Sequence, residues 1–351
     1  MNRTMKICLE YQTWNRTAPK LLLQYAVGAL LYCPADHGGI IEHICNGTLP
    51  ELKSVAFCLE DTIQDSYLPE AEKKLVNHMK LLYDAVKEGR VHQKKLPLLF
   101  VRIRTPEHMR DIFQQLGKYQ RILTGFILPK FSSKNQEEYK KATFEINQKA
   151  QAIKYVMPTL ESPDILLKKQ TRQQELLDIK KTLDSMKKYV LNVRVGGNDL
   201  CNVYGLRRRE TQSIYDILVM QDVLSDISSV FLGEYVISGV VWEYFEGEAD
   251  KEDKWKIGLQ RELQRDKLNG FVGKTAIHPS QISVIQKAYA VELGDYEDAK
   301  AILNWQQSTR AVAKSVKYAR MNESKVHQKW AEKIMALAHI YGIKEESHEG
   351  F

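Results

Sequence analysis

The stretch Leu98-Leu-Phe-Val-Arg-Ile-Arg104, together with residues 107–116 that follow it, decides the fold. The first part is a short apolar run with the large side chains of a buried strand. The second part is amphipathic and long enough for a helix. A buried strand followed by an amphipathic helix is one βα unit, and successive βα units pair their strands in parallel.

The same unit recurs along most of the chain. Eight apolar runs begin roughly 26 to 45 residues apart, and this spacing is close to one βα unit each. Eight units over about 250 residues favour an α/β fold, a TIM (β/α)8 barrel. An open doubly wound sheet is the alternative, because periodicity does not show whether a sheet closes. The runs are Ala29–Cys33, Val55–Leu59, Leu98–Ile103, Gly125–Leu128, Tyr155–Met157, Leu191–Val195, Val236–Trp242 and Phe271–Ile277.

The chain is expected to divide at residue 280. Residues 1–280 carry the eight units and would form the barrel. Residues 281–351 are rich in Ala, Lys and Glu and show no strand pattern, so we expect a C-terminal helical extension or lid. The highly charged stretch 247–256 is expected to be a solvent-exposed excursion.

The composition is that of a globular protein. Hydrophobic residues make up 44% and charged residues 27%, which excludes a disordered chain. No run approaches the ~20 apolar residues that cross a bilayer, and no secretory signal pattern is visible, so we expect a cytoplasmic protein. The 5 cysteines form no CxxC pair, as expected in a reducing compartment. The net charge of +7 is spread along the chain and fits a small anionic substrate as well as nucleic acid.

Polar side chains follow nearly every apolar run. In a barrel the carboxyl ends of the strands meet at one rim, where barrel enzymes have their active sites. The residues after the runs are therefore the candidate site residues: Asp36, His37, Glu60, Asp61, Arg102, Arg104, Lys130, Glu161, Asn198, Asp199, Glu243 and His278.

Two arginines share one face of the third run. Arg102 and Arg104 alternate with Val101 and Ile103, which suit the helix-packed outer face, so both arginines are expected to point toward the barrel mouth. Inward guanidinium groups need anionic partners, either a substrate carboxylate or carboxylates of the barrel. A structural ion pair with Glu60 or Asp61 is the alternative to substrate binding.

Two carboxylates follow the fifth and sixth runs. Glu161 and Asp199 would lie on the same side of the mouth, where they repel each other unless a cation or a proton lies between them. Oxygen ligands with open positions suit Mg²⁺, which keeps waters and takes further ligands from the substrate. The alternative is that Glu161 caps the helix after Pro163.

Other polar motifs allow two interpretations each. Asp36 and His37 would contact a ligand or belong to a turn with the glycines that follow, and Gly196-Gly197 would let the backbone approach a ligand or turn the chain. His278 precedes a proline and is interpreted as a packing histidine rather than a base. Residues 207–209, three consecutive arginines, would bind a phosphate or lie on a solvated helix start.

Several short segments at these strand ends match a known family in the family's order, over about 250 residues. They are Leu30-Leu-Tyr-Cys-Pro34, Cys58-Leu-Glu-Asp61, Val101-Arg-Ile103, Ile127-Leu-Pro-Lys130, Leu160-Glu-Ser162, Gly196-Gly-Asn-Asp199 and Gly270-Phe-Val-Gly-Lys274 with Ile277-His-Pro-Ser-Gln281. In these segments the sequence resembles the citrate lyase beta subunit family and its relatives, the malyl-CoA lyases and the HpcH/HpaI aldolases. It looks closest to a divergent branch associated with tellurium-resistance and stress gene clusters, through Tyr204-Gly-Leu-Arg-Arg208, Val236-Ile-Ser-Gly239 and Val241-Trp-Glu-Tyr244.

The resemblance implies a TIM barrel that uses Mg²⁺, or Mn²⁺ in its place, to cleave or form a carbon–carbon bond. It implies that Glu161 and Asp199 hold the metal, while Arg102 binds the carboxylate and enolate oxygen of an oxaloacetate- or glyoxylate-like fragment. Glu60 and Asp61 would support Arg102 or order water on the metal.

The resemblance also suggests residues at the edge of the site. Glu323, in Met321-Asn-Glu323, looks like the late acidic residue that malyl-CoA lyases bring on a C-terminal lid, commonly from a neighbouring subunit, although the acid there is Asp. Further substrate-binding candidates are Asp36, His37, Arg104 and Lys130. The first strand continues as Pro34-Ala-Asp-His-Gly38 instead of the family's Phe-Val-Pro-Gly, so the use of a coenzyme A thioester stays open.

The sequence is therefore interpreted as a carbon–carbon lyase or aldolase acting on a 2-oxo acid or an acyl-CoA-like substrate, by retro-aldol or retro-Claisen cleavage through an enolate. Candidates for the base are water on the metal, Glu323 and His37. The alternative is a non-catalytic ligand-binding or assembly component of a stress-response or tellurium-resistance-linked biosynthetic cluster. Nucleic-acid binding is disfavoured because few aromatic residues interleave with the arginines at 207–209. Related lyases are often trimers or hexamers, so a homo-oligomer is expected.

Overall fold

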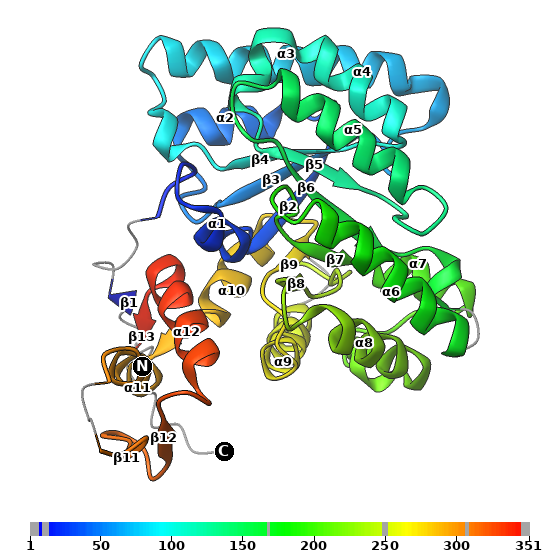
Figure 1. Ribbon diagram of the computed structural model, residues 1–351. Coiled ribbons are helices and arrows are strands. Elements are labelled where there is room, and N and C mark those ends of the chain that lie inside the picture. Colours follow the sequence, from blue (N-terminus) through cyan, green and yellow to red (C-terminus); the bar gives the residue numbers. More distant parts are fainter. Residues whose placement is uncertain (1–6, 9–13, 167–168, 248–251, 306–308, 345–351) are drawn as a thin grey trace.

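The computed structural model describes residues 7–8, 14–166, 169–247, 252–305 and 309–344. Eight parallel strands form its centre (Figure 1), and they pair in the order β8-β7-β6-β5-β4-β3-β2-β9. A parallel bridge between Gly239, next to β8, and Lys274 of β9 closes the sheet on itself. The predicted (β/α)8 barrel is thus confirmed. Its strands are β2 (Ala29–Pro34), β3 (Ser54–Cys58), β4 (Leu98–Arg102), β5 (Gly125–Leu128), β6 (Tyr155–Leu160), β7 (Val193–Val195), β8 (Ile237–Ser238) and β9 (Lys274–Ala276).

Helices alternate with these strands and surround the barrel (Figure 1). The start of α4 shows how the sequence sets such a boundary, because the Thr105 side chain accepts a hydrogen bond from the His108 backbone N–H at 3.1 Å and Pro106 takes the first helical position. The helices of the barrel region are α1 (Lys20–Ala26), α2 (Gly39–Asn46), α3 (Leu68–Lys87), α4 (Pro106–Leu116), α5 (Gln136–Lys149), α6 (Lys169–Ser185), α7 (Gly197–Val203), α8 (Leu218–Phe231), α9 (Lys254–Leu268) and α10 (Ser280–Ala288).

Short 3-10 turns account for most differences from the expected helix boundaries. The predicted helix from Pro163 starts as the turn η5 (Pro163–Leu166) before α6 begins. The segment after Ser213 starts as η6 (Ile214–Asp216), because Ser213 and Asp216 form a reciprocal capping box there and the extended backbone of Ile217 separates it from α8. The remaining 3-10 turns are η2 (Asp65–Tyr67), η3 (Gln93–Lys95) and η4 (Gly117–Ile122).

The charged stretch 247–256 is only partly an excursion. Asp253 is exposed, but α9 begins at Lys254 and Trp255 is 4% exposed, so the end of the stretch belongs to a packed helix. Residues 248–251 lie outside the described residues. The indole ring of Trp255 packs in the main core. Burial of this ring stabilises the packed helix although the neighbouring residues are charged.

The C-terminal region contains strands as well as helices, so the expectation of helices alone was wrong. Two helices, α11 (Leu293–Leu303) and α12 (Gln328–Tyr341), pack on each other. β13 (Ile343–Lys344) pairs with both β1 (Ile7–Cys8) and β10 (Val291–Glu292), and β11 (Val312–Lys314) pairs with β12 (Met321–Glu323) as a hairpin. These strands have only two or three residues, too few for an alternating pattern to stand out in the sequence.

This region attaches to the amino-terminal end of the barrel. The Tyr341 hydroxyl donates to the Tyr25 carbonyl of α1 at 2.6 Å, and the Lys333 ammonium donates to the carbonyl of Gly270, just before β9, at 3.0 Å. Figure 1 shows α11, α12 and the β11–β12 hairpin to one side of the barrel, next to α1 and α10. The division at residue 280 stays a prediction, and α10, directly after it, is the helix that follows the last barrel strand. Among the described residues, no helix is long and apolar enough to cross a membrane.

Candidate active site

Arg102 is the centre of a cluster of charges at the carboxyl ends of the strands. It is the last residue of β4 and is 7% exposed. Its Nη1 donates to Asp61 Oδ2 at 2.8 Å, and its Nη2 lies 2.8 Å from Glu161 Oε1 and 2.9 Å from Glu60 Oε2. One guanidinium therefore joins carboxylates that follow two different strands, β3 and β6.

Arg102 was predicted either to bind a substrate anion or to form a structural ion pair, and this cluster is compatible with both. The ion pairs with Glu60 and Asp61 are present, and they aim the guanidinium at Glu161. A guanidinium carries five N–H donors, of which the three carboxylates use three. Nε is buried without a partner, so one N–H of Nη1 remains for a bound molecule.

Lys130 contributes both its backbone and its side chain. Its φ of 48° lies in the left-handed region, which is uncommon for a residue with a side chain. In this conformation its backbone N–H donates to Glu161 Oε1 at 3.0 Å. Its ammonium contacts Glu60 Oε1 and lies 3.3 Å from Asp61 Oδ1. Lys130 therefore fixes one oxygen of Glu161 and neutralises the acids that hold Arg102.

Glu161 directly follows β6 and is 3% exposed. Its Oε1 accepts from Arg102 and Lys130, whereas no described side chain or backbone group donates to Oε2. None of the described hydrogen bonds of Glu161 goes to the turn after Pro163; there Ser162 Oγ accepts from the Asp164 backbone at 3.4 Å, so Glu161 is not the cap. Burial raises the pKa of Glu161 to about 7, against the opposing charge of Arg102.

Gly196 leaves room for that carboxylate. A Cβ atom at Gly196 would lie 2.2 Å from Glu161 Oε2 and 2.4 Å from Glu161 Cβ, well inside contact distance. The φ of Gly196 is −89°, which any residue adopts, so the requirement for glycine is steric. Gly197 is equally crowded, because its Cβ would meet the Val240 side chain at 2.8 Å. The two glycines thus pack α7 closely against β6 and β8.

Asp199 lies in the first turn of α7, next in the sequence to the rim residue Asn198. Its side chain is half-buried, and among the described residues it forms no ion pair with a basic side chain. Burial and then the charge of Asp61 raise the pKa of Asp199, and Asp199 in turn raises the pKa of Glu161. The two carboxylates are therefore close enough to repel each other.

The donor set fits a hard divalent cation. Four acids (Glu60, Asp61, Glu161 and Asp199) face two bases (Arg102 and Lys130), which leaves a formal excess of negative charge at the rim. No group of three or more His, Cys, Asp or Glu side chains in the described part of the chain is arranged to hold a metal. A site with two carboxylates suits Mg²⁺, which keeps waters and accepts substrate oxygens, better than a closed structural zinc site.

Three predicted substrate-binding residues lie outside this cluster. Arg104 lies beyond the end of β4, and its guanidinium binds the loop after β3 through the carbonyls of Leu59, at 2.7 Å, and Ile63 and the carboxylate of Asp65. Because the strand ends at Arg102, the strand alternation that aimed both arginines at the mouth does not hold for Arg104. Asp36 and His37 follow β2, and their charges act on His78 of α3.

Glu323 is not brought to the cluster within one chain. It ends β12, in the hairpin that packs on α11. This C-terminal region attaches at the amino-terminal end of the barrel, whereas Glu161 follows the carboxyl end of β6. The neighbouring Asn322 donates to Asp298 of α11 at 2.8 Å, which fixes this hairpin to its own extension. A contribution of Glu323 to the site would require a second copy of the chain.

A comparison with protein families decides what this barrel is. The family described as carbon–carbon bond lyase of the TIM-barrel fold matches residues 21–343. The chain belongs to this family. Both the fold and the class of enzyme that the sequence resemblance implied, a carbon–carbon lyase, are thereby confirmed. A comparison with curated protein sequences found no match.

Solved structures share the fold of this lyase-family chain. CitE of Mycobacterium tuberculosis in complex with magnesium, acetoacetate and coenzyme A is 21% identical, with a TM-score of 0.55, and the match covers 90% of this chain and 99% of that one. The citrate lyase beta subunit of the same organism, complexed with oxaloacetate and magnesium, is 20% identical over 76% of this chain and 98% of that one, with a TM-score of 0.48. RipC from Yersinia pestis is 17% identical over 76% of this chain and 95% of that one, with a TM-score of 0.48.

The lyase barrel contains another buried arginine, Arg194, which was not among the residues predicted from the sequence. Arg194, in the middle of β7, is 2% exposed, and its Nη2 donates to Thr275 Oγ1 at 2.6 Å. It has no carboxylate partner among the described residues. It interacts with the Tyr32 side chain, whose ring centroid lies 5.9 Å from the Arg102 guanidinium carbon. Arg194 lies between two valines in the sequence, so the alternation applied to Arg102 would have found it.

The structure also shows the surroundings of His278 and of the arginines at 207–209. The His278 ring stacks on Phe245 with 4.7 Å between ring centroids, in keeping with a packing histidine. Residues 207–209 are not on a helix. Arg208 is 3% exposed, so the solvated interpretation was wrong for this arginine.

Proposed function

We propose that this chain is a Mg²⁺-dependent lyase that cleaves a carbon–carbon bond next to a 2-oxo acid group, through an enolate. The observation that carries the proposal is the pair Glu161 and Asp199. No described group donates to Glu161 Oε2, Asp199 forms no ion pair with a described basic side chain, and the charge of Arg102 acts on both acids. The CitE structure with the same fold holds magnesium and acetoacetate, and we extend a divalent cation and a small oxo acid to this chain on that basis. Mn²⁺ would serve the same oxygen ligands.

The side chains divide the work of binding and orientation. Glu161 and Asp199 would hold the ion, which supplies positive charge where the oxo and carboxylate oxygens of the substrate bind. Lys130 and Arg102 fix Glu161 Oε1, so that Oε2 faces the ion in one orientation. Because these contacts exist before substrate arrives, little reorganisation is needed during the reaction.

Arg102 would stabilise the charge that develops on cleavage. In a 4-hydroxy-2-oxo acid a base would take the proton of the 4-hydroxyl group, and the other fragment would depart with a new carbonyl group. The electron pair of the broken C3–C4 bond would stay on the 2-oxo acid fragment as an enolate, which then takes up a proton. The N–H of Arg102 Nη1 that donates to no described carboxylate would bind the enolate oxygen. A positioned donor of this kind typically contributes about 10²–10³ in rate.

Glu60 and Asp61 would act through Arg102 rather than on the substrate. Both acids contact Arg102 and Lys130, and Glu60 is largely buried. Removing either acid would let the guanidinium turn away from Glu161. We therefore propose them as positioning residues.

The test is a cleavage assay on a panel of 4-hydroxy-2-oxo acids and a matched acyl-CoA thioester, with and without Mg²⁺. We expect turnover of at least one oxo acid that disappears in Glu161→Ala and in Asp199→Ala while both variants keep the far-ultraviolet circular dichroism of the parent. Turnover of the thioester alone would replace the 2-oxo acid by that substrate class. Absence of turnover and of Mg²⁺ binding, with an intact fold, would favour the non-catalytic binding component instead.

A further inference from the structure

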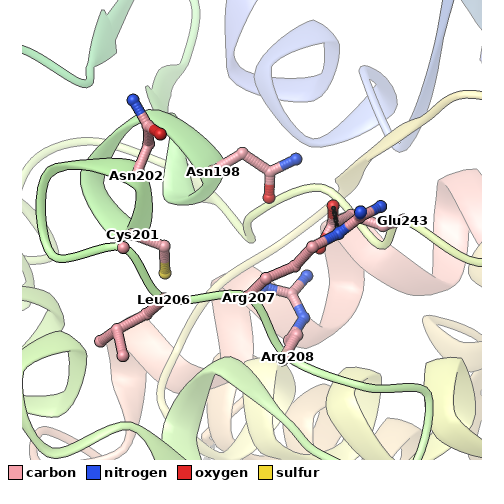
Figure 2. A pocket seen from close by; sticks show the side chains of 8 residues that line it. Asn198, Cys201, Asn202, Leu206, Arg207, Arg208 and Glu243 are labelled. Carbon is pink, nitrogen blue, oxygen red and sulfur yellow. Dashed lines mark hydrogen bonds and ion pairs between the residues drawn. The ribbon is translucent and has the colours of Figure 1, made fainter.

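A pocket of about 310 Å³ opens on the same rim, next to the proposed metal pair. Its walls are α7, the loop after it and the segment after β8, and it lies one residue from the pair because Asn198, which lines it, precedes Asp199. Figure 2 shows the side chains of Asn198, Arg207 and Glu243 directed toward one another, with Arg208 beside them. We call it the α7–β8 pocket and define it by Asn198, Cys201, Asn202, Gly205, Leu206, Arg207, Arg208 and Glu243.

Arg207 presents most of its guanidinium to this pocket. Its side chain is 79% exposed, and its Nε donates to Glu243 Oε1 at 3.3 Å. Glu243 is 17% exposed and follows β8, so the acid acts as a fixed anchor for the mobile arginine. Among the described residues nothing accepts from the Nη atoms of Arg207, which leaves the bidentate edge of the guanidinium open.

Arg208 forms the back of the pocket. It is 3% exposed, its Nη2 lies 3.5 Å from Glu262 Oε1, and its guanidinium carbon lies 5.4 Å from the centroid of the Trp242 ring. Its Nε is buried without a hydrogen-bond partner. Because this N–H is buried, Arg208 closes the back of the pocket rather than donating to a molecule inside it.

The groups that remain unpaired are donors. Among the described residues of the lining, Glu243 is the only carboxylate and is already bound by Arg207 Nε, whereas the Arg207 Nη atoms and the amides of Asn198 and Asn202 are available. A surplus of donors, two of them nitrogens of one guanidinium group, is the complement of an anionic group with several acceptor oxygens. The volume is at the low end of the ~300–1,000 Å³ typical of ligand pockets and fits a short arm of a substrate.

We propose that the α7–β8 pocket binds a second anionic group, a carboxylate or a phosphate-like group, at the end of the substrate remote from the metal pair. The inference rests on the proposed function, because the other end of the substrate is the 2-oxo acid at Glu161 and Asp199. It assigns the substrate to dianionic 2-oxo acids and makes Arg207 the residue that selects them.

The experiment compares ligands that differ only in the distal group, by calorimetric titration of the full chain in the presence of Mg²⁺ at fixed ionic strength. 2-Oxopentanoate has no distal charge, 2-oxoglutarate adds a carboxylate on the same carbon chain, and 2-oxo-4-phosphonobutanoate adds a phosphonate. We expect the unsubstituted chain to bind at least one of the two dianions about tenfold more tightly than 2-oxopentanoate, the gain expected from one charge-assisted contact. The tighter of the two identifies the distal group.

The variants separate the pocket from the net charge. Arg207→Gln is expected to abolish the tenfold preference while leaving the affinity for 2-oxopentanoate unchanged, and Arg207→Lys to restore part of it. Arg209 is exposed, lies two residues after Arg207 and does not line the pocket. Arg209→Gln removes the same charge and is expected to keep the full preference.

Three outcomes would overturn the proposal. If the unsubstituted chain bound all three ligands with equal affinity, the pocket would not bind a distal anion. The proposed function would stand in that case. Equal loss in Arg207→Gln and Arg209→Gln would assign the effect to net charge. Absence of Mg²⁺-dependent binding of 2-oxopentanoate itself would overturn the proposed function, and this inference with it.

Discussion

The carboxylate of Glu161 lies against the bare Cα of Gly196, so closely that a Cβ atom there would be 2.2 Å from Oε2. This contact joins the residue after β6 to the residue after β7. No donor to Oε2 is found among the described residues, and in the proposed function this oxygen would bind the cation. The glycine therefore belongs to the site although it carries no functional group.

Gly196→Ala is predicted to displace the Glu161 carboxylate. Because the added atom would also lie 2.4 Å from Glu161 Cβ, rotation of the carboxylate alone does not relieve the overlap. We expect Mg²⁺ affinity to fall by about tenfold or more, measured by calorimetry, with the fold retained. Gly233→Ala is the control, since no atom lies within 4 Å of its Cβ position. Unchanged affinity in Gly196→Ala would contradict this account of the contact.

Arg102→Lys is predicted to lower both turnover and stability, although lysine keeps the positive charge. A single ammonium does not reproduce the planar fork that joins Asp61 to Glu161. Leaving buried carboxylates unpaired typically costs about 3–5 kcal/mol. We expect turnover to fall by about 100-fold or more and the urea midpoint to drop. Arg90→Lys, at an exposed pair with Glu88, should leave the urea midpoint nearly unchanged. Equal small effects for both substitutions would argue against the central role of Arg102.

Mg²⁺ binding is predicted to weaken in mildly acidic solution. Burial raises the pKa of Glu161 to about 7, and only the ionised carboxylate binds the cation. A proton competes with the ion below this pKa, so the affinity should fall about tenfold per pH unit below pH 7 and level off above pH 8. Titrations between pH 5.5 and 8.5 measure this. An affinity that stays flat to pH 5.5 would indicate an ordinary glutamate.

Lys274→Met is predicted to destabilise the barrel behind the α7–β8 pocket. The fully buried ammonium lies 3.0 Å from Glu262 and 2.7 Å from Asp266, and neither acid is exposed. Loss of the lysine leaves buried negative charge, which costs about 3–5 kcal/mol in the free energy of unfolding. Lys187→Met removes a half-exposed partner of Glu234 and should cost about 0–1 kcal/mol. Chemical denaturation that ranks the two variants equally would contradict the network.

The barrel was predictable because its signal repeats. Each strand is an apolar run followed by a helix, and the closing bridge at Gly239 and Lys274 is a consequence of eight such units. The short strands β10 to β13 were missed because each has two or three residues. β10 and β13 also pair across distant segments, whereas β11 and β12 form a local hairpin whose strands are too short to show an alternating pattern.

At the site, residue types were predictable and their partners were not. Alternation along β4 aimed Arg102 inward, but the strand ends there, so the same rule misplaced Arg104. The role of Gly196 depends on the distance between two neighbouring loops, which no local pattern encodes. The left-handed backbone of Lys130 likewise appears only in three dimensions, since nothing in Leu128-Pro-Lys130 demands it.

The central claim is that Glu161 and Asp199 share one divalent cation. The most direct measurement is Mn²⁺ titration followed by electron paramagnetic resonance, on the unsubstituted chain and on Glu161→Gln and Asp199→Asn, with displacement by Mg²⁺. We predict one ion per chain, displaced by Mg²⁺, and loss of that ion in either variant while the fold persists. Full occupancy in both variants, or no bound ion in the unsubstituted chain, would contradict the claim.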